Sequence, residues 1–401
     1  MEIRPILSAM LRNKTGALLV GLQIALTLAV AANAVSIIMQ RVDKMNRPTG
    51  TDAANTFFVQ SFGFGPKYDH KATVRRDLDM IRALPGVVAA ASISAVPLSN
   101  SGSSATFGAE ADPRKVTIEA NYFRADEQAL DALGAKLAEG RFFTKEEVEF
   151  LEASTSRFAP VVVMTRDMAK ALFGDEPALG KQVHDGLGQS ATVVGIIDHM
   201  LGSWTDWDKL TRIVFVPEVQ FGPIARYVVR AEPGMRDALM AEVEQRLSSS
   251  DFSRAITLVR SQEEFAARSY RADSRMVAFL GVIVALIFLV TALGIVGLAS
   301  FHVGVRTKQI GTRRAVGARK IDIIRYFLVE NLLLTIAGVA IGALLAFGFG
   351  QWLSKVYSLP PLSPIYIGGG ILLLTVVGQL AVFVPALKAA AIPPAIATRT
   401  V

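Results

Sequence analysis

Apolar residues divide the chain into four long runs separated by polar segments. The runs cover residues 15–40, 276–305, 326–352 and 365–387. Each can cross a bilayer as a helix, since about 20 apolar residues at a rise of roughly 1.5 Å span its hydrocarbon core. A central Asp, Lys or Arg would cost about 2.5–3.5 kcal/mol on insertion scales, and none lies centrally in these runs. We therefore predict an α-helical membrane protein with four transmembrane helices.

The polar stretch between the first and second runs predicts a large α+β domain outside the membrane. Short segments rich in β-forming residues alternate there with amphipathic ones. We expect two lobes, the second over roughly 116–222, and the pattern allows a βαβ unit at either end of the domain. Expected strands are 56–62, 87–96, 116–120, 160–164, 192–197, 213–216 and 226–230. Expected helices are 77–84, 166–173 and 235–247, and 99–104 reads as a mobile loop.

These segments define a linear order of domains. Residues 262–275 are helical in character, and we expect them to continue into the second span as one rod or stalk. The predicted order is an N-terminus with the first helix (1–40), the outer domain (41–275), the second helix (276–305), a loop (306–325), the third helix (326–352), an outer loop (353–364), the fourth helix (365–387) and a tail (388–401).

Basic residues flank the spans on one side only. The segment before the first span, the loop 306–325 and the tail hold twelve Lys and Arg against two acids. The whole chain carries +7, so the remaining residues are net negative. The positive-inside rule places both termini and this loop in the cytoplasm, and the large domain and the loop 354–364 outside. The twelve are Arg4, Arg12, Lys14, Arg306, Lys308, Arg313, Arg314, Arg319, Lys320, Arg325, Lys388 and Arg399.

The high net charge is therefore a signal of topology, and it does not indicate nucleic acid as a partner. The first run contains an Ala-Asn-Ala sequence at 32–34 that resembles a signal-peptidase site. Apolar residues continue through Met39, so we expect an uncleaved anchor. The chain has no cysteine, so the exported domain must fold without disulfides.

The loop after the second span carries the sharpest motif. From Arg306 it reads R-T-K-Q-I-G-T-R-R-A-V-G-A. It resembles the MacB/FtsX-type permeases of ABC transporters, whose loop reads roughly R-x-x-E-I-G-x-x-R-A-x-G-A. Segments 84–87, 134–143, 172–181, 193–197 and 385–395 are similar to other parts of that family, in the same order. Gln309 replaces the family's usual acid, which removes a charge but preserves size and hydrogen bonding.

The resemblance implies the permease subunit of an ABC transporter of the mechanotransmission type, and no enzyme activity on this chain. It also implies a bacterial inner membrane, with the large domain in the periplasm. It implies a cytoplasmic ATPase dimer that binds ATP and Mg, a second permease copy or related chain, and a periplasmic adaptor. Family members act on lipoproteins, peptides, small toxic compounds or cell-wall hydrolases. The implied ATPase-coupling residues are Lys308, Gln309, Ile310, Gly311, Arg313, Arg314, Ala315, Gly317 and Ala318.

The residues of this loop allow two physical interpretations. Membrane lipids with anionic headgroups would account for Lys and Arg beside the membrane. They would not account for Gly311 and Gly317, which permit close approach or sharp turns, or for the apolar Ile310 and Val316. A short helix along the membrane that docks into a groove on an ATPase would account for both.

No catalytic, cofactor-binding or metal site is predicted on this chain. Gly174, Gly180 and Lys181 are reminiscent of a phosphate loop, but five residues separate the glycines where four are needed, and Gln182 replaces the Ser or Thr that binds Mg²⁺. The four histidines are scattered. Asp198 and His199 near Trp204 are more typical of packing than of a metal site.

Two features inside the third span have open interpretations. Glu330 lies about one turn from the cytoplasmic end, where it can reach the interface or pair with Arg325 or Arg306. A proton relay would need charged partners deeper in the membrane. Gly338-x-x-x-Gly342 predicts close helix packing, either within one chain or across a dimer.

A function of another class also fits the sequence. The chain could be a non-transporting regulatory module that activates an extracytoplasmic partner such as a cell-wall hydrolase. Whether segment 99–104 and the outer face bind a soluble substrate or a resident protein would discriminate between the two functions.

Overall fold

A computed structural model describes residues 14–112, 115, 117–152, 155, 157–357 and 360–394. The chain divides at Asn46/Arg47 and at Arg271/Ala272 into a helical unit and an inserted outer domain. Predictions that rest on Arg4, Arg12, Val116, Ala395 and Arg399 lie outside the described residues.

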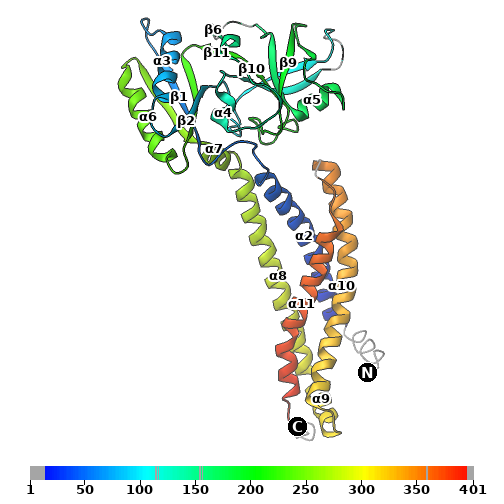
Figure 1. The fold of residues 1–401 in the computed structure, drawn as a ribbon. Coiled ribbons are helices and arrows are strands. Elements are labelled where there is room, and N and C mark those ends of the chain that lie inside the picture. Colours follow the sequence, from blue (N-terminus) through cyan, green and yellow to red (C-terminus); the bar gives the residue numbers. More distant parts are fainter. Residues whose placement is uncertain are drawn as a thin grey trace. The chain divides into compact units, whose positions relative to one another are not determined.

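The helical unit contains all four predicted membrane spans as continuous helices (Figure 1). They are α2 (Lys14–Met45), α8 (Arg271–Val305), α10 (Lys320–Tyr357) and α11 (Pro364–Ala390), and a short helix α9 (Thr307–Ala315) lies between α8 and α10. More than half of the apolar window of α2 is buried, against 11% of that of α8. Helix α2 is therefore the central helix, and α8 leaves most of its apolar surface to lipid or to another chain.

Glycines allow α10 to pack directly on α2. A Cβ on Gly338 would lie 2.9 Å from the carbonyl oxygen of Gly21, and one on Gly342 would lie 2.8 Å from that of Ala25. These obstacles are backbone atoms, which cannot rotate away. The Gly338-x-x-x-Gly342 motif therefore packs within one chain, which decides between the two alternatives that the sequence allowed.

We expect Gly342→Ala to lower the stability of the helical unit and Gly348→Ala to leave it unchanged or slightly raised. Overpacking costs typically 1–3 kcal/mol, whereas Ala in place of Gly in a helix contributes up to about 1 kcal/mol. Nothing lies within 4 Å of a Cβ at Gly348, on the same helix. Thermal unfolding of both variants in the same detergent checks this. Equal transition temperatures would contradict the close packing of α10 on α2.

Polar side chains connect the helices inside the unit. The Nδ2 of Asn33 donates to the carbonyl oxygen of Ala346 at 3.1 Å, and the hydroxyl groups of Thr27 and Thr291 are 2.7 Å apart. At the end of the unit next to residue 46, Lys44 pairs with Asp273 at 2.8 Å. The polar residues that interrupt the first apolar run thus stabilise its contacts with other helices.

The first lobe of the outer domain is two interleaved βαβ units. Its strands are β1 (Thr56–Gly63), β2 (Val87–Ser92), β12 (Ile224–Ala231) and β13 (Arg254–Ser261), and its helices are α3 (His70–Arg82) and α6 (Arg236–Ser250). The antiparallel sheet has the order β13-β1-β12-β2, so β12 separates β1 from β2 and β1 separates β12 from β13. This is the ferredoxin-like arrangement, and it confirms the βαβ unit expected at either end of the domain.

The second lobe is inserted between β2 and β12. Its main strands are β3 (Ser103–Gly108), β4 (Ile118–Arg124), β5 (Leu137–Gly140), β7 (Val161–Thr165), β8 (Gln182–Asp185), β9 (Ser190–Ile197) and β10 (Ile213–Val216). They follow the order β5-β9-β7-β10-β4-β3-β8, and a further pairing of β8 with β9 closes six of them into a barrel. Phe107, Val162, Val193 and Val214 belong to the core of this lobe.

Smaller elements complete the outer domain. They are α4 (Ala129–Leu133), a 3₁₀ helix (Lys145–Glu147), β6 (Glu149–Glu152), α5 (Arg166–Phe173), β11 (Glu218–Phe221) and α7 (Gln262–Ser269). Strands β6 and β11 form a separate parallel pair. A hydrophobic cluster that includes Phe58, Phe123 and Phe215 joins the two lobes.

The continuous rod expected over 262–275 is wrong. Helix α7 ends at Ser269 and α8 begins at Arg271. Between them Tyr270 is buried in the outer domain and has turn dihedral angles (φ −87°, ψ 7°). The expected loop 99–104 is shorter than predicted and ends at Gly102, because β3 begins at Ser103.

Candidate functional site

The motif loop folds as a short helix of its own between the membrane spans α8 and α10. Helix α9 begins after Arg306, where the Thr307 hydroxyl donates to the carbonyl oxygen of Val303 at 2.9 Å. It ends in a turn at Gly317, whose φ of +103° lies in the region that favours glycine. A short helix in this loop is what the docking interpretation of the motif predicted.

The predicted coupling residues lie on two different faces of this helix. Lys308, Gln309, Arg313, Ala315 and Gly317 are exposed, Arg314 and Ala318 are half-buried, and Ile310 and Gly311 are buried. Ile310 belongs to a hydrophobic cluster with residues of α2, α8, α10 and α11. Its expected contact with an ATPase therefore needs correction, because Ile310 packs against the chain's own transmembrane helices.

The start of α9 is held to α10 by a buried ion pair. The Nη1 of Arg306 lies 3.1 and 3.0 Å from the two carboxylate oxygens of Glu330, and 3.2 Å from the hydroxyl oxygen of Tyr326. Glu330 is 3% exposed. Of the two partners predicted for Glu330, Arg306 and Arg325, the one that pairs with it in the structure is Arg306.

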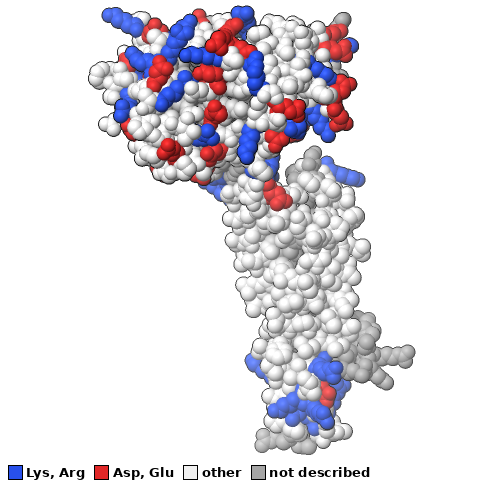
Figure 2. Space-filling model, viewed as in Figure 1, with Lys and Arg blue, Asp and Glu red and all other residues white. Residues whose placement is uncertain are grey.

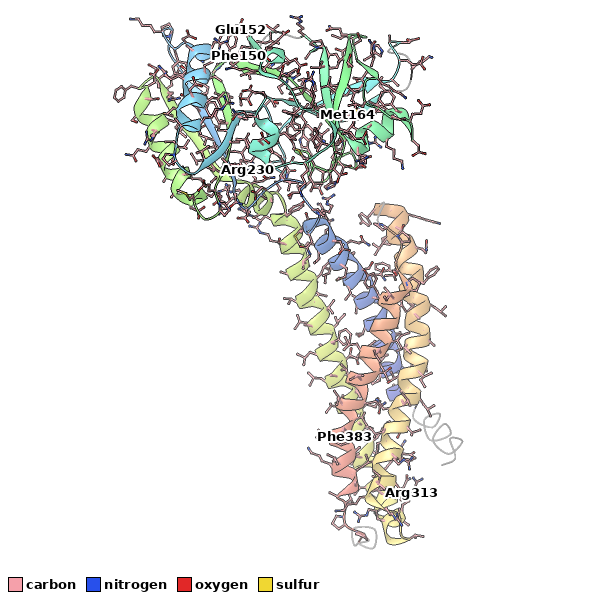
Figure 3. The ribbon with its side chains drawn as sticks, viewed as in Figure 1. Phe150, Glu152, Met164, Arg230, Arg313 and Phe383 are labelled. Carbon is pink, nitrogen blue, oxygen red and sulfur yellow. The ribbon has the colours of Figure 1, made fainter. Side chains whose placement is uncertain are left out.

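The end of α9 is held to α11. The Nη1 of Arg314 donates to the carbonyl oxygens of Ala390 at 2.6 Å and Ile392 at 3.3 Å. These carbonyls lie at the C-terminus of α11, where backbone acceptors have no partner within the helix. Arg313, labelled on α9 in Figure 3, stacks its guanidinium 5.1 Å from the centre of the Tyr326 ring.

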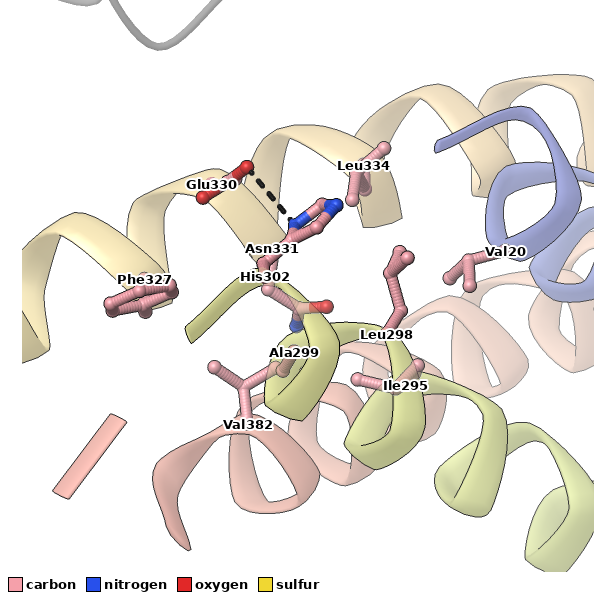
Figure 4. Close-up of a pocket in the computed structure, with 10 residues that line it drawn as sticks. All are labelled: Val20, Ile295, Leu298, Ala299, His302, Phe327, Glu330, Asn331, Leu334 and Val382. Carbon is pink, nitrogen blue, oxygen red and sulfur yellow. Dashed lines mark ion pairs between the residues drawn. The ribbon is translucent and has the colours of Figure 1, made fainter. Parts of the chain in front are cut away.

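A small cavity lies beside the buried carboxylate (Figure 4). His302 Nδ1 is 3.5 Å from Glu330 Oε1, and Asn331 has no hydrogen-bond partner for its Nδ2. The cavity has about 20 Å³, which is room for roughly one water. Helices α2, α8, α10 and α11 all contribute to its lining, so Glu330 lies where the four helices meet.

The exposed side of α9 borders an open groove of 460 Å³. Thr312, Arg313 and Val316 line it from α9 and the turn that follows, and Asp322 and Tyr326 line it from α10. Val316 is 84% exposed, which is unusual for an aliphatic residue beside so many charges. The sequence motif identified Val316 as an apolar contact but gave no sign of Tyr326, although aromatic residues are enriched at membrane interfaces.

The other candidates form no site in the described part of the chain. Gly174 ends helix α5, and Lys181 precedes strand β8, so this segment lacks the strand-to-helix context of a phosphate loop. His199 Nε2 lies 2.9 Å from the carbonyl oxygen of Pro48, and Asp198 pairs with Arg166. No metal-binding group of His, Asp or Glu occurs among the residues that the structure describes.

Comparisons with known proteins cover both units. A family model described as the MacB-like periplasmic core domain matches residues 19–246, and one described as the FtsX-like permease C-terminal matches residues 281–394. The macrolide export ATP-binding/permease protein MacB of Chromobacterium violaceum is 29% identical over 301 residues, which cover 70% of this chain and 43% of that protein. The uncharacterized ABC transporter permease YknZ of Bacillus subtilis is 26% identical over 269 residues, 66% of each chain.

A solved structure also matches part of the chain. The periplasmic region of MacB from Actinobacillus actinomycetemcomitans is 17% identical with a TM-score of 0.35, and the match covers 54% of this chain and 92% of that one. The chain spans less than half the length of the MacB relative from Chromobacterium violaceum and 66% of that of YknZ.

Proposed function

The chain belongs to the MacB/FtsX-type permeases of ABC transporters, and from this premise we propose that it couples ATP hydrolysis on a separate cytoplasmic ATPase to motion of its outer domain. It is a multi-pass inner-membrane protein with a large α+β domain between its first and second transmembrane helices. Permeases of this family work with ABC ATPases, which gives the general kind of partner.

One observation carries the proposal: α9 exposes one face and is fixed by the other to two transmembrane helices. Arg306 holds its start to Glu330 of α10, and Arg314 holds its end to the last carbonyls of α11. Force applied to the exposed face would therefore move α10 and α11 together with α9. A loop that transmits force needs this rigid attachment, whereas a loop that only binds lipid headgroups does not.

The charge distribution supports a cytoplasmic position for α9. Lys and Arg gather at the end of the helical unit that carries α9, and a largely uncharged band separates them from the other end (Figure 2). By the positive-inside rule this end faces the cytoplasm, so both termini are cytoplasmic and the outer domain is periplasmic.

The proposed assembly contains two permease chains, identical or related, and an ATPase dimer that binds ATP and Mg. ATP binding brings the two copies of α9 together, and α8 carries the movement toward the outer domain, to which it is joined through α7. The output is export or extraction of a substrate outside the cytoplasm, where a periplasmic adaptor could also engage. The MacB relative is named as a macrolide exporter, and no substrate is assigned to this chain.

The proposal is tested by purifying the tagged chain in mild detergent together with the proteins that accompany it in its native membrane. We expect a stoichiometric ATPase to purify with it. Recovery of the chain alone, under conditions that keep a known ABC complex intact, would contradict the proposal and favour the regulatory module that activates an extracytoplasmic partner.

Variants on the exposed face of α9 should lose the ATPase without losing the fold. We expect Lys308→Glu combined with Val316→Asp to lower ATPase recovery at least about tenfold, since both side chains are exposed and neither supports the helical unit. The control is Lys355→Glu, an exposed lysine at the other end of α10. A matching loss with Lys355→Glu, or none with the double variant, would show that α9 is not the docking element.

A further inference from the structure

The sheet of the first lobe is covered by helices on one face and partly open on the other. Phe57 and Val59 of β1 pack with residues of α3 and α6 in one hydrophobic cluster. Alternation along the strand places Phe58, Gln60 and Phe62 on the opposite face. These three residues line two cavities of the outer domain, which lie where the sheet meets the second lobe and segment 99–104.

The two cavities share one residue in their linings. The larger has a volume of 330 Å³ and the smaller 160 Å³, and Arg226 of β12 lines both. Ser99 and Ser101 contribute to the wall of the smaller cavity, and Ser103 contributes to that of the larger. The larger cavity alone lies in the size range of small-molecule sites, roughly 300–1,000 Å³.

Arg226 is a half-buried cation, and its hydrogen-bond partners among the described residues are all neutral. Its Nε donates to the side-chain oxygen of Gln60 at 2.9 Å and its Nη1 to the carbonyl oxygen of Ser94 at 2.6 Å. No carboxylate of the described residues forms an ion pair with it. Burial without an anion lowers the pKa of Arg226, because desolvation disfavours the charged form. An incoming carboxylate would supply the missing partner.

A second unsatisfied group lines the larger cavity. Glu218 is 3% exposed, and its Oε2 accepts a hydrogen bond from Arg124 Nε at 3.0 Å, but its Oε1 has no partner. Burial raises the pKa of this carboxyl group. Arg124 balances the charge of Glu218, so Arg226 leaves the lining net positive. A buried carboxylate oxygen without a donor is unfavourable, and a donor on a ligand would supply the missing hydrogen bond.

The mouth of the larger cavity is apolar. Phe62 and Ile224 are 41% and 47% exposed, and Pro223 lies beside them. Large side chains on the surface of a folded domain mark contact sites when they border a hollow with convergent polar groups.

We propose that this double cavity binds an amphipathic zwitterion, whose carboxylate pairs with Arg226, whose ammonium group donates to Glu218, and whose apolar side group packs against Phe62 and Ile224. The site belongs to the outer domain alone. Binding there does not depend on the ATPase coupling proposed above, and failure of either proposal leaves the other standing.

The experiment is a binding measurement on the full chain in lipid nanodiscs. The probe is the dipeptide leucyl-phenylalanine, which carries a carboxylate, an ammonium group and two apolar side chains. Its C-terminal amide lacks the carboxylate, and its N-acetyl derivative lacks the ammonium group. Saturation-transfer NMR or calorimetric titration gives the affinity of each.

We expect the wild-type chain to bind the dipeptide about ten- to a hundredfold more tightly than either derivative, since a hydrogen bond to a charged group contributes about that much. Arg226→Gln should abolish the preference for the free carboxylate and keep that for the ammonium group. Glu218→Gln retains an acceptor for Arg124. It should abolish the preference for the free ammonium group and keep that for the carboxylate. Arg246→Gln, an exposed position on α6, should change neither.

Absence of dipeptide binding by the wild-type chain would overturn the proposal. So would equal affinities for the three probes, a result that needs no variant and holds even where a variant fails to fold. Preferences that persist unchanged in both Arg226→Gln and Glu218→Gln would place the binding elsewhere on the molecule.

Discussion

Replacing Asp77 by Ala should destabilise the outer domain by about 3–5 kcal/mol, because it leaves a buried cation without its partner. Arg254 Nη1 lies 2.6 Å from Asp77 Oδ2, and the two side chains are 0% and 1% exposed. Tyr227 donates its hydroxyl to the same carboxylate oxygen at 2.7 Å. The change therefore removes the acceptor of two buried donors, one of them charged.

The residue two positions along the same helix is the control. Asp79 is exposed on α3, and Asp79→Ala should change stability by less than about 0.5 kcal/mol. Hydrogen exchange of peptides from α3, β12 and β13 reports on this lobe directly, which matters because a chain of two units need not unfold in one step. Equal protection in the two variants would contradict a stabilising role for the buried pair.

The double variant Asp77→Leu with Arg254→Leu distinguishes the cost of an unpaired buried charge from the contribution of the ion pair itself. Replacement of both members of a buried ion pair by apolar residues is often close to neutral. We therefore expect the double variant to be more stable than Asp77→Ala. A larger loss would show that the bonds from Arg254 to other groups, including the carbonyl oxygen of Leu247 at 2.7 Å, outweigh its pairing with Asp77.

The membrane spans could be predicted from the sequence because the bilayer itself imposes their length and polarity. The structure extends each of them at its ends. Helix α2, for example, continues past the apolar run to Met45, and α10 begins at Lys320. Hydropathy does not report on these added turns, because polar residues outside the hydrocarbon core remain compatible with a helix.

The sequence predicts strands in the outer domain where the residues alternate or are strongly β-forming. It does not predict strands that form only because a neighbouring strand pairs with them. Strand β5 reads Leu-Ala-Glu-Gly and β6 reads Glu-Phe-Leu-Glu, which carry no clear period. They are strands because β9 and β11 lie beside them, and those partners are distant in sequence. Strand β13 was missed for another reason, since its run Ala-Ile-Thr-Leu-Val does contain β-forming residues that could have indicated it.

The candidate coupling site was located by its motif, but its two faces could not be assigned from the sequence. A nine-residue helix with several Lys and Arg gives almost no apolar periodicity, so Ile310 appeared as available for a partner as Val316. The contact of Arg306 depends on how α10 packs beside α9, and that of Arg314 depends on where α11 ends. Helix packing therefore turns Ile310 inward and leaves Val316 exposed.

The second large effect is expected at the buried ion pair that holds α9 in place. Glu330→Leu leaves the Arg306 guanidinium, whose side chain is 14% exposed, beside an apolar residue where the four transmembrane helices meet. We expect a loss of about 3–5 kcal/mol in stability, seen as a lower thermal transition in detergent. Arg325→Leu is the control, because Arg325 is exposed on the same helix and was the other partner that the sequence allowed.

The double variant Arg306→Leu with Glu330→Leu distinguishes support of the fold from transmission of force. Without a lone buried charge, it should recover most of the stability that Glu330→Leu loses. Ile310 would still pack and Arg314 would still hold the end of α9, so the ATPase should bind. ATP hydrolysis, however, should no longer respond to the permease, because the start of α9 is no longer fixed to α10. Full stimulation of the ATPase by this variant would show that the attachment serves stability alone.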